Sequence, residues 1–456
     1  MKIKCDSRLV KKGDTFIALR GHKTDGHNYI EEAIKNGCKK IVVEDDNDYD
    51  ILKEVVPDTK EYLINYLTSN YSKKLEDITL IGVTGTNGKT TICFLIYQIL
   101  KLLNYKVAYI GTIGYFKDDF VKNLNNTTPD ILEVYNLLLD ASKSRIEYVV
   151  MEVSSHSLDY QRLEGLKFSL VAFTNLTKDH LDHHLTMENY LNSKLKIFNY
   201  LKDNAVVITN TDSEYGKYFE KGNYKTVGTN DCTYKIIDYE CLNDSSFVGL
   251  EVDNVYYGVN INLINKYNAY NYVEAFAVID SLGVDRDDIV KVSHNVWPPP
   301  GRCDMVNYKT NIVVVDYAHT PDAVSNVLNN FRDNALGKIY TIIGCGGNRD
   351  RTKRPQMAQI STDISDYVIF TDDNPRYEDE NIIINDMIEG LTNNNYKIIH
   401  NRKTAIEKGI DMLRDRDILL ILGKGHEDYQ IIKDQKLYFD DKVCAQNYID
   451  KKLKKL

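Results

Sequence analysis

The sequence predicts an α/β protein in which buried parallel strands alternate with helices. Short runs rich in Val, Ile and Leu recur along the chain, polar or glycine-rich loops follow many of them, and helical segments come next. Continuous apolar strands of this kind form parallel sheets that helices cover on both faces. We expect a central doubly wound sheet, a Rossmann-like C-terminal domain and a small N-terminal α/β domain.

The length of the chain predicts more than one domain. It has 456 residues, of which 43% are hydrophobic, and a single core rarely grows to that size. The clearest break is Trp297-Pro298-Pro299-Pro300-Gly301, because prolines and glycine interrupt both helices and strands. We place one boundary there and another before the first long apolar strand. The predicted domains are residues 1–75, 76–300 and 301–456.

The apolar runs set the expected elements in chain order. The first domain is expected to contain strands at 15–19 and 40–43 around a helix at 29–36. The second is expected to contain a helix at 91–103 and strands at 78–83, 107–110, 148–152, 170–173 and 205–208. In the third, strands are expected at 312–316, 339–343, 367–370 and 418–422. Doubly wound sheets bind ligands beside the C-terminal ends of their strands.

Charge and composition exclude some classes of partner. The net charge of −9 argues against a general nucleic-acid binder, which usually has a basic face. No apolar run approaches the roughly 18 to 20 residues of a membrane span, and the N-terminus shows no signal segment. Eight scattered cysteines without a CxxC pair indicate reduced thiols. We therefore expect a cytoplasmic monomer without nucleic-acid or membrane partners.

A phosphate-binding loop follows the strand at 78–83. It reads Gly85-Thr86-Asn87-Gly88-Lys89-Thr90-Thr91. A strand, a glycine turn and a helix start direct backbone N–H groups and the helix dipole at phosphate oxygens. Lys89 is expected to contact the β- and γ-phosphates and Thr90 to bind Mg²⁺. Val83 stands where the strict pattern has glycine, so the loop is a variant that predicts ATP as ligand.

Polar residues also follow other predicted strands. Glu152 ends one strand and is a candidate Mg²⁺ ligand, while the segment 174–182 contains His180. Taken singly, each of these residues would more often be structural. Arg302 follows the proline-rich break and is suited to stabilise charge on a transferring phosphate.

Three loops of the last domain predict a site for an amino acid. They are Gly344–Arg351, Asp373–Arg376 and Gly423–Glu427. Arg349 and Arg376 offer bidentate forks for a carboxylate, while Asp373 and Glu427 are suited to an ammonium group. Ordinary turns with surface ion pairs are the alternative interpretation of these loops.

These motifs together resemble the Mur ligases of bacterial cell-wall synthesis. The resemblance rests on Thr84–Thr91, Met151–His156, the Asp-Asn-Pro-Arg loop at 373–376 and the Gly-Lys-Gly-His-Glu loop at 423–427. It is strongest to the branch that adds the third peptide residue to UDP-MurNAc-L-Ala-D-Glu. It implies an ATP-dependent amide ligase that works through an acyl phosphate with two Mg²⁺. Arg376 implies meso-diaminopimelate as the added amino acid, because the arginine of the family's Asp-Asn-Pro-Arg motif binds the distal carboxylate of that amino acid.

The resemblance also assigns roles residue by residue. For ATP it implies Gly85, Thr86, Asn87, Gly88, Lys89, Thr90, Thr91, Asn265, Asn268, Arg302, Asp316 and His319. For UDP-MurNAc-dipeptide it implies Cys5, Ser7, His22, Lys23, Thr24, Asn126, Thr127, Thr128, Ser154 and Arg162. For diaminopimelate it implies Arg349, Asp373, Asn374, Pro375, Arg376, Gly423 and Glu427. The implied catalytic residues are Lys89, Lys194, Arg302 and His180.

The metal ligands implied in the same way are Thr90, Glu152, His180 and Lys194. Lys194 is implied as a carbamate formed with CO₂. This modification inverts the charge of the side chain, because an ammonium repels Mg²⁺ whereas a carbamate supplies oxygen ligands.

Three alternatives remain open at this point. A lysine-adding member of the same branch is the nearest, and Arg376 argues against it. A folylpolyglutamate synthetase is a different metabolic class, and Thr90 together with the 373–376 loop argues against it. A non-catalytic binder of nucleotides or amino acids is the third, and Lys89, Glu152, Lys194 and Arg302 together argue against it.

Overall fold

The computed structural model describes residues 2–21, 24–242, 245–333 and 335–454. The chain forms two compact units. The first contains Met1–Lys89, Leu100–Thr209 and Ser213–Tyr224, and the second contains Thr90–Ile99, Asn210–Asp212 and Lys225–Leu456. The three-domain division stays a prediction.

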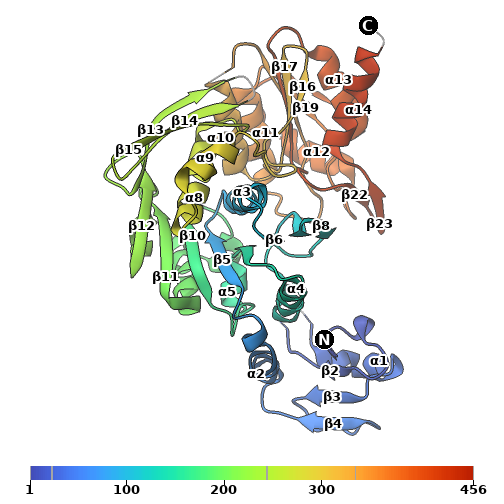
Figure 1. Cartoon of the computed structure of the whole chain (residues 1–456). Coiled ribbons are helices and arrows are strands. Elements are labelled where there is room, and N and C mark those ends of the chain that lie inside the picture. The colour runs from blue at the N-terminus through green and yellow to red at the C-terminus, as the bar shows by residue number, and fades with distance from the viewer. Residues whose placement is uncertain (1, 22–23, 243–244, 334, 455–456) are drawn as a thin grey trace. The chain divides into compact units, whose positions relative to one another are not determined.

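A small parallel sheet lies at the start of the first unit, in the order β1-β2-β3-β4 (Figure 1). Its elements are β1 (Ile3–Lys4), β2 (Thr15–Ile17), α1 (Ile30–Lys35), β3 (Lys40–Val43), β4 (Leu52–Val55) and α2 (Thr59–Tyr71). Side chains alternate across a strand, so Phe16 and Ile41 pack with α1 while Ile17 and Val42 pack with the apolar side of α2. The expected strands and helix of this segment are confirmed within two residues.

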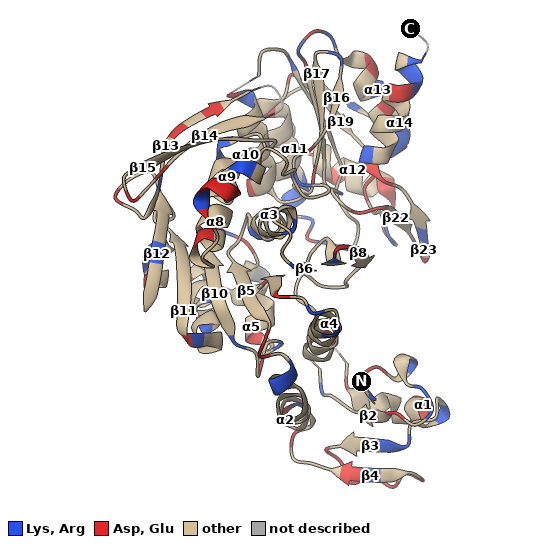
Figure 2. Cartoon of the chain, in the orientation of Figure 1, with Lys and Arg blue, Asp and Glu red and all other residues tan. Residues whose placement is uncertain are grey.

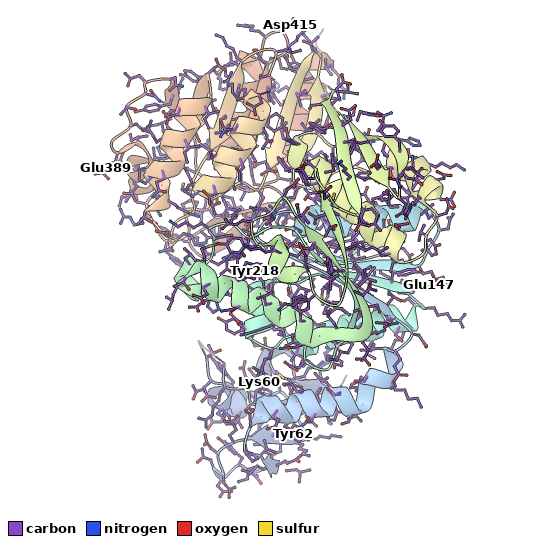
Figure 3. The ribbon with its side chains drawn as sticks, turned by 90° about the vertical axis from the view of Figure 1, so that its left-hand side faces the viewer. Lys60, Tyr62, Glu147, Tyr218, Glu389 and Asp415 are labelled. Carbon is purple, nitrogen blue, oxygen red and sulfur yellow. The ribbon has the colours of Figure 1, made fainter. Side chains whose placement is uncertain are left out.

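Helix α2 is also held by polar contacts from its first turn, where Lys60 and Tyr62 lie (Figure 3). The Tyr62 hydroxyl donates to Glu54 of β4 at 3.0 Å. The Lys60 ammonium donates to the side chain of Gln161 at 2.7 Å.

The main sheet of the first unit has the strand order β11-β10-β5-β9-β6-β7-β8. Its strands are β5 (Thr79–Thr84), β6 (Val107–Gly111), β7 (Gly114–Lys117), β8 (Asp119–Lys122), β9 (Tyr148–Glu152), β10 (Phe168–Phe173) and β11 (Leu201–Asn210). The pairings from β11 to β6 are parallel, whereas β7 pairs antiparallel with β6 and β8 pairs antiparallel with β7. Its helices are α4 (Ile131–Lys143), α5 (Ser155–Asp159), α6 (Leu181–His184) and α7 (Met187–Leu195), and it also contains the two ends of α3 (Lys89–Leu102), whose middle part Thr90–Ile99 belongs to the second unit.

The register of this sheet brings three strand ends to one edge. Val83 of β5 pairs with Glu152 of β9, and Thr84 of β5 pairs with Phe173 of β10. The phosphate loop, Glu152 and the segment after Phe173 therefore start side by side. Short 3-10 helices complete the unit: η1 (Ser7–Leu9), η2 (Gly26–Tyr29), η3 (Ser72–Lys74), η4 (Lys196–Tyr200) and η5 (Gly216–Phe219).

The second unit contains an antiparallel region that the sequence prediction of an all-parallel central sheet did not include. Its antiparallel strands are β13 (Tyr234–Cys241), β14 (Ser246–Val252) and β15 (Val255–Ile261), whereas β12 (Asn223–Gly228) pairs parallel with β13. The helices α8 (Lys266–Ser281) and α9 (Arg286–Ser293) follow these strands. Asp253 and Asn254 both have positive φ, as a two-residue type I′ hairpin requires. In β15, buried Val259 and Ile261 alternate with exposed Gly258 and Asn260, which suits a sheet with one solvated face.

The rest of the second unit is a three-layer domain with the strand order β16-β17-β21-β18-β19-β20 (Figure 1). Its strands are β16 (Asp304–Tyr308), β17 (Asn311–Asp316), β18 (Ile339–Ile343), β19 (Tyr367–Phe370), β20 (Tyr396–Ile398) and β21 (Ile418–Leu422). Only β16 is antiparallel among these pairings. The hairpin β22 (Tyr429–Ile432) and β23 (Gln435–Tyr438) follows.

Alternation along these strands builds two cores. Val314 and Leu420 face α10 (Pro321–Arg332), α11 (Lys353–Ile364) and α12 (Glu380–Ile388). Val313 and Leu419 face α13 (Arg402–Met412) and α14 (Asp441–Leu453) on the other side. Because both faces are covered, the strands are apolar throughout, which confirms the predicted doubly wound arrangement.

Residues of both charge signs share single helices of the second unit. Figure 2 shows acidic and basic residues side by side on α9 and α14. All eight cysteines are free. Within the described ranges, no helix has both the length and the hydropathy needed to cross a bilayer.

A buried ion pair joins α13 to α14. The Arg402 Nε and Nη2 atoms donate to the two carboxylate oxygens of Asp441 at 2.7 Å, and both side chains are fully buried. Asp441→Asn leaves a buried guanidinium without its counter-charge, so we expect a loss of about 3–5 kcal/mol in the free energy of unfolding. Denaturant titration measures the change. Asp450→Asn, at an exposed position of α14, is the control and stays within about 0.5 kcal/mol; equal effects of the two would contradict the prediction.

Candidate active site

The phosphate loop joins β5 to α3 in the first unit. Gly85 and Gly88 have φ values of 151° and 87°, which residues other than glycine rarely adopt. The Lys89 ammonium donates to the carbonyl oxygens of Gly85 and Thr86 at 2.8 and 2.7 Å. Thr90 and Thr91 follow as buried residues at the start of α3. The loop thus has the glycine turn, lysine and helix start that phosphate binding needs.

The segment after β10 braces this loop. The Thr86 N–H donates to the Asn175 carbonyl oxygen at 2.8 Å, and the Asn87 N–H donates to the Asn175 side chain at 3.0 Å. The Thr174 hydroxyl donates to the Asn87 carbonyl oxygen at 2.6 Å. The sequence predicted a site in this segment, and the structure gives these residues a supporting position beneath the loop.

Lys194 reaches the same loop from α7. Its side chain is 1% exposed, and its Nζ donates to the Gly85 carbonyl oxygen at 2.7 Å. Nζ also lies 4.7 Å from the centre of the Tyr190 ring. Burial, followed by the charge of Lys89, lowers the pKa of Lys194 well below its ordinary value. A lysine in such surroundings is readily neutral, and only a neutral amine reacts with CO₂.

Glu152 is fully buried at the end of β9. Its Oε1 accepts from the Tyr109 hydroxyl at 2.5 Å and from the Thr112 N–H at 2.8 Å, and its Oε2 accepts from the Thr112 hydroxyl at 3.1 Å. A Cβ on Gly111 would lie 2.3 Å from Oε1, so glycine is required beside the carboxylate. These donors hold Glu152 in one orientation next to the phosphate loop.

His180 caps α6 with a positive φ and a side chain that is 47% exposed. Its Nε2 lies 3.5 Å from an Asp179 oxygen, and its ring meets the edge of the His156 ring at 5.1 Å between centroids. Burial, and then the nearby His180, His183 and His184, lower the pKa of His156 to about 4. Four imidazoles therefore gather beside α5 and α6.

The predicted muramoyl-dipeptide residues form a cluster in part. The Thr128 hydroxyl donates to the Glu152 carbonyl oxygen at 2.8 Å and accepts from the Ser154 N–H at 3.0 Å. Arg162 Nη1 donates to the Thr128 carbonyl oxygen at 2.7 Å. The Thr127 hydroxyl lies 3.1 Å from that of Thr112, and Asn126 is exposed nearby in the chain.

The N-terminal residues of this predicted site are partly described. The Ser7 hydroxyl donates to Glu32 at 2.5 Å, and Thr24 is exposed. Burial, and next the charge of Asp130, raise the pKa of Cys5, which places its thiol near the 126–130 segment. His22 and Lys23 lie outside the described residues.

In the second unit, Arg302 lies over the ring of Tyr317, with 4.7 Å from Cζ to the ring centre. His319 Nδ1 lies 2.7 Å from the Tyr317 carbonyl oxygen. Asp316 is buried and accepts from the N–H groups of Cys303 and Ala318 at 2.8 and 2.9 Å. Burial raises the pKa of Asp316, and the nearby Arg302 opposes that shift. Asp316 thus fixes the turns that carry Arg302.

Asn265 and Asn268 are both buried at the start of α8. Asn265 Nδ2 donates to the Tyr267 hydroxyl at 3.2 Å, and Asn268 Nδ2 donates to the Ile264 carbonyl oxygen at 2.8 Å. Their amides therefore have partners within the protein, and the ATP contact predicted for them stays a prediction.

The three predicted amino-acid loops meet at the strand ends of the C-terminal domain. The Gly347 N–H donates to the Asn374 carbonyl oxygen at 2.9 Å, and a Cβ on Gly347 would lie 1.9 Å from the Pro375 carbonyl oxygen. The Gly423 N–H donates to the Asp316 carbonyl oxygen at 3.1 Å. The Asn374 side chain donates to Glu427 at 2.8 Å.

The two candidate arginines differ in how they are held. Arg376 has a positive φ, and its Nη1 donates to the carbonyl oxygens of Gly347 and Asn374 at 2.9 and 3.5 Å. Within the described residues these bonds use Nη1 alone, which leaves the Nε–Nη2 edge for a carboxylate. Arg349 is exposed on the neighbouring loop.

One acidic member, Glu427, is held by a lysine that was not predicted from the sequence. Lys424 is fully buried, and its Nζ lies 3.4 Å from a Glu427 oxygen and also donates to the Tyr429 carbonyl oxygen. Asp373 accepts from the Asn374 N–H at 2.7 Å. Lys424 lies between two glycines with positive φ directly after a buried strand, a signal that was available in the sequence. Tyr317 and Tyr190 were also missed.

The fold and these sites define an ATP-dependent ligase with a phosphate loop on a doubly wound sheet. Family models match three parts of the chain: the Mur ligase family catalytic domain at 2–72, the Mur ligase middle domain at 83–279, and the Mur ligase glutamate ligase domain at 301–425. The chain belongs to the Mur ligase family.

Relatives match the chain over its whole length. The UDP-N-acetylmuramoyl-L-alanyl-D-glutamate–2,6-diaminopimelate ligase of Clostridium botulinum is 39% identical over 98% of this chain and 95% of its own. That of Clostridium tetani is 40% identical over 98% and 94%. A solved structure of a ligase with this name is 31% identical, with a TM-score of 0.70 over 99% of this chain and 95% of that one. MurF from Thermotoga maritima in complex with ADP shares the fold, at 19% identity and a TM-score of 0.66 over 99% and 98%.

Gly85→Ala tests the close contact under the phosphate loop. A Cβ there would lie 1.9 Å from the Thr174 hydroxyl, so loop and brace must separate. We expect a loss of about 1–3 kcal/mol in the free energy of unfolding and at least about tenfold weaker ATP binding. Nucleotide titration and denaturant unfolding measure the two effects. Gly222→Ala, at positive φ with no atom within 4 Å, is the control; ATP affinity that falls equally in both variants would count against the contact.

Proposed function

We propose that this chain joins meso-diaminopimelate to the D-Glu γ-carboxylate of UDP-MurNAc-L-Ala-D-Glu at the expense of ATP, as a step in peptidoglycan precursor synthesis. The observation that carries the proposal is the Arg376 guanidinium, anchored through Nη1 to the Gly347 carbonyl oxygen with its second edge available. A carboxylate at the far end of diaminopimelate fits that edge bidentately. The names of the relatives from Clostridium agree with this choice.

In the first step, the γ-carboxylate attacks the γ-phosphate of ATP, and an acyl phosphate and ADP form. Phosphorylation is needed because a free carboxylate is a poor electrophile. Lys89 contacts the β- and γ-phosphates, and Arg302 stabilises the charge that develops on the transferred group. Both side chains act electrostatically, so neither forms a bond to the substrate.

Two Mg²⁺ ions are the implied metals, with Thr90, Glu152, His180 and carbamylated Lys194 as ligands. The residues fit this group, because Glu152 is an oriented carboxylate and Lys194 is a buried amine of lowered pKa that accepts CO₂. When bound, the ions neutralise phosphate charge. The neutral amine of Lys194 would add CO₂ and release a proton, and the resulting carbamate anion would attract Lys89 instead of repelling it.

In the second step, the amine of diaminopimelate attacks the acyl carbon, and phosphate leaves from the tetrahedral intermediate. Arg349 and Arg376 hold carboxylates of the incoming amino acid, while Asp373 and Glu427 hold its ammonium group. The attacking amine must lose a proton, and His180 is the proposed base. Asn374 and Lys424 keep Glu427 in position.

The remaining assignments follow from this reaction. The substrates are small molecules, and we propose that the chain acts on them as a monomer in the cytoplasm, without a nucleic-acid or membrane partner. A folylpolyglutamate synthase from Mycobacterium tuberculosis shares the fold at 14% identity and a TM-score of 0.64, which carries no substrate information. A lysine-adding ligase is the second candidate, and the free edge of Arg376 argues against it.

Phosphate release tests the proposal directly. With UDP-MurNAc-L-Ala-D-Glu and ATP, we expect the chain to release phosphate with meso-diaminopimelate and to respond weakly to L-lysine. In Arg376→Ala, kcat/KM for diaminopimelate should fall roughly 30- to 1,000-fold, because the distal carboxylate loses its partner. This fall corresponds to an increase of about 2–4 kcal/mol in the activation free energy. The value for L-lysine should stay unchanged.

Arg351→Ala is the matched control for that variant. Arg351 is on the adjacent loop, but its guanidinium is bound to Asp386 at 2.7 and 2.8 Å. Removing it should leave the ratio of the two substrates within about twofold. Turnover of L-lysine alone by the unaltered chain would exclude diaminopimelate, and no turnover of either would exclude the ligase activity.

Lys194→Ala tests the carbamate. The variant lacks the proposed oxygen ligands, so kcat should fall at least about 100-fold, and high concentrations of a short carboxylic acid should restore part of it. Lys167→Ala, at an exposed position of the same unit, is the control and should keep its activity. Full activity in Lys194→Ala, or a loss that no carboxylate restores, would show that Lys194 has another role.

A further inference from the structure

Asp159, His183 and His184 form a compact cluster in the first unit, here named the α5–α6 cluster. Asp159 ends α5, and the two histidines end α6. The Asp159 Oδ2 atom lies 3.2 Å from His183 Nε2 and 3.6 Å from His184 Nδ1. Among the described residues, these three offer one ligand atom each within 4.8 Å of one another. That spacing is small enough for one ion to reach all three.

Neighbouring side chains orient these ligand atoms. The Ser155 hydroxyl lies 2.9 Å from His184 Nε2, which leaves Nδ1 directed at Asp159. The Lys196 ammonium holds the other Asp159 oxygen, Oδ1, at 2.6 Å. Histidine ligands of metals regularly bond through their second ring nitrogen, and ligating carboxylates are hydrogen-bonded in the same way. The cluster therefore has the outer contacts of a metal site as well as its ligand atoms.

We propose that the α5–α6 cluster binds a divalent transition metal of the zinc type. Two imidazoles and one carboxylate are a ligand set that Zn²⁺, Co²⁺ and Fe²⁺ accept. Mg²⁺ prefers oxygen ligands and keeps its waters, so the ions of the ATP reaction do not compete well for this set. None of the three residues is among the ligands proposed for Mg²⁺, which are Thr90, Glu152, His180 and Lys194.

The position of the cluster gives the metal a structural role. Helix α5 follows β9 and Glu152, whereas α6 follows the segment in which Asn175 braces the phosphate loop. An ion bound to both helix ends fixes the 174–184 segment against α5. The ring of His156 stacks on His183 at 4.4 Å between centroids and covers one side of the cluster. Occupancy should therefore raise the thermal stability of the whole chain.

Cobalt binding tests the proposal on the full chain. After dialysis against a chelator, the protein is titrated with Co²⁺ in excess Mg²⁺, and the visible absorption of bound Co²⁺ is recorded. We expect one Co²⁺ per chain, competition by Zn²⁺, and a rise in Tm with either ion. In His183→Ala and Asp159→Asn, Co²⁺ affinity should fall at least about tenfold and the rise in Tm should vanish. His183 is preferred to His184, because His184 stacks on Tyr190 at 4.7 Å and its loss also disturbs packing.

Two further variants test whether the bound Co²⁺ lies at this cluster or at a different histidine. His400→Ala removes the half-exposed histidine that lies 2.9 Å from Asp372 in the second unit, and Co²⁺ binding should be unchanged. His180→Ala should also keep the signal, because His180 is not a member of the cluster. No Co²⁺ absorption by the unaltered chain, a signal that survives Asp159→Asn, or a signal that depends on His180 would each overturn the proposal.

Discussion

The carbonyl oxygen of Gly85 accepts hydrogen bonds from both Lys89 and Lys194, at 2.8 and 2.7 Å. Two ammonium groups on one oxygen repel each other, and burial removes the water that would screen them. Burial, and then the charge of Lys89, lower the pKa of Lys194. Anionic oxygens relieve this repulsion, whether they come from phosphates beside Lys89 or from a carbamate on Lys194. The arrangement of the phosphate loop, Lys89 and Lys194 therefore favours the binding of such anions.

The rest of the first unit keeps that carbonyl oxygen in place. Gly85 is pressed against Thr174, the Asn175 carbonyl oxygen accepts from Thr86, and Tyr109 and Thr112 hold Glu152 on the adjacent strand. These residues are distant in the sequence and adjacent only through the register of β10, β5 and β9. A buried polar network of this kind fixes geometry only when each member has its partner. The sheet thus fixes the positions of these polar groups, and the loops carry the charged side chains.

The sequence predicted the buried parallel strands well, since β9, β18, β19 and β21 have the predicted bounds. These strands are apolar on both faces, so no periodicity is needed to find them. The sequence analysis does not predict β13 to β15, although the Asp253-Asn254 turn carries a hairpin signal. In the site, the phosphate loop was found from local pattern alone. Lys424 was missed, because a lysine beside glycines is by default a solvated residue.

The arginines of the C-terminal loops show what sequence alone cannot separate. Arg349, Arg351 and Arg354 lie within six residues, and all three offer the same guanidinium fork. Arg351 is bound by Asp386, and Arg354 is fully buried against Glu378 and Asp386 with bonds of 2.7 Å.

Asp386 and Glu378 therefore already bind two of these three guanidinium groups, those of Arg351 and Arg354. Glu378 also accepts from the Asn348 N–H at 2.9 Å, and Arg354 lowers the pKa of Glu378 to about 2. The Arg354–Glu378 ion pair thereby stiffens the loop that carries Arg349 and the carbonyl oxygen of Gly347, on which Arg376 is anchored. Selectivity for a second carboxylate therefore depends on which arginines the protein has not already neutralised, and that distribution is a property of the fold.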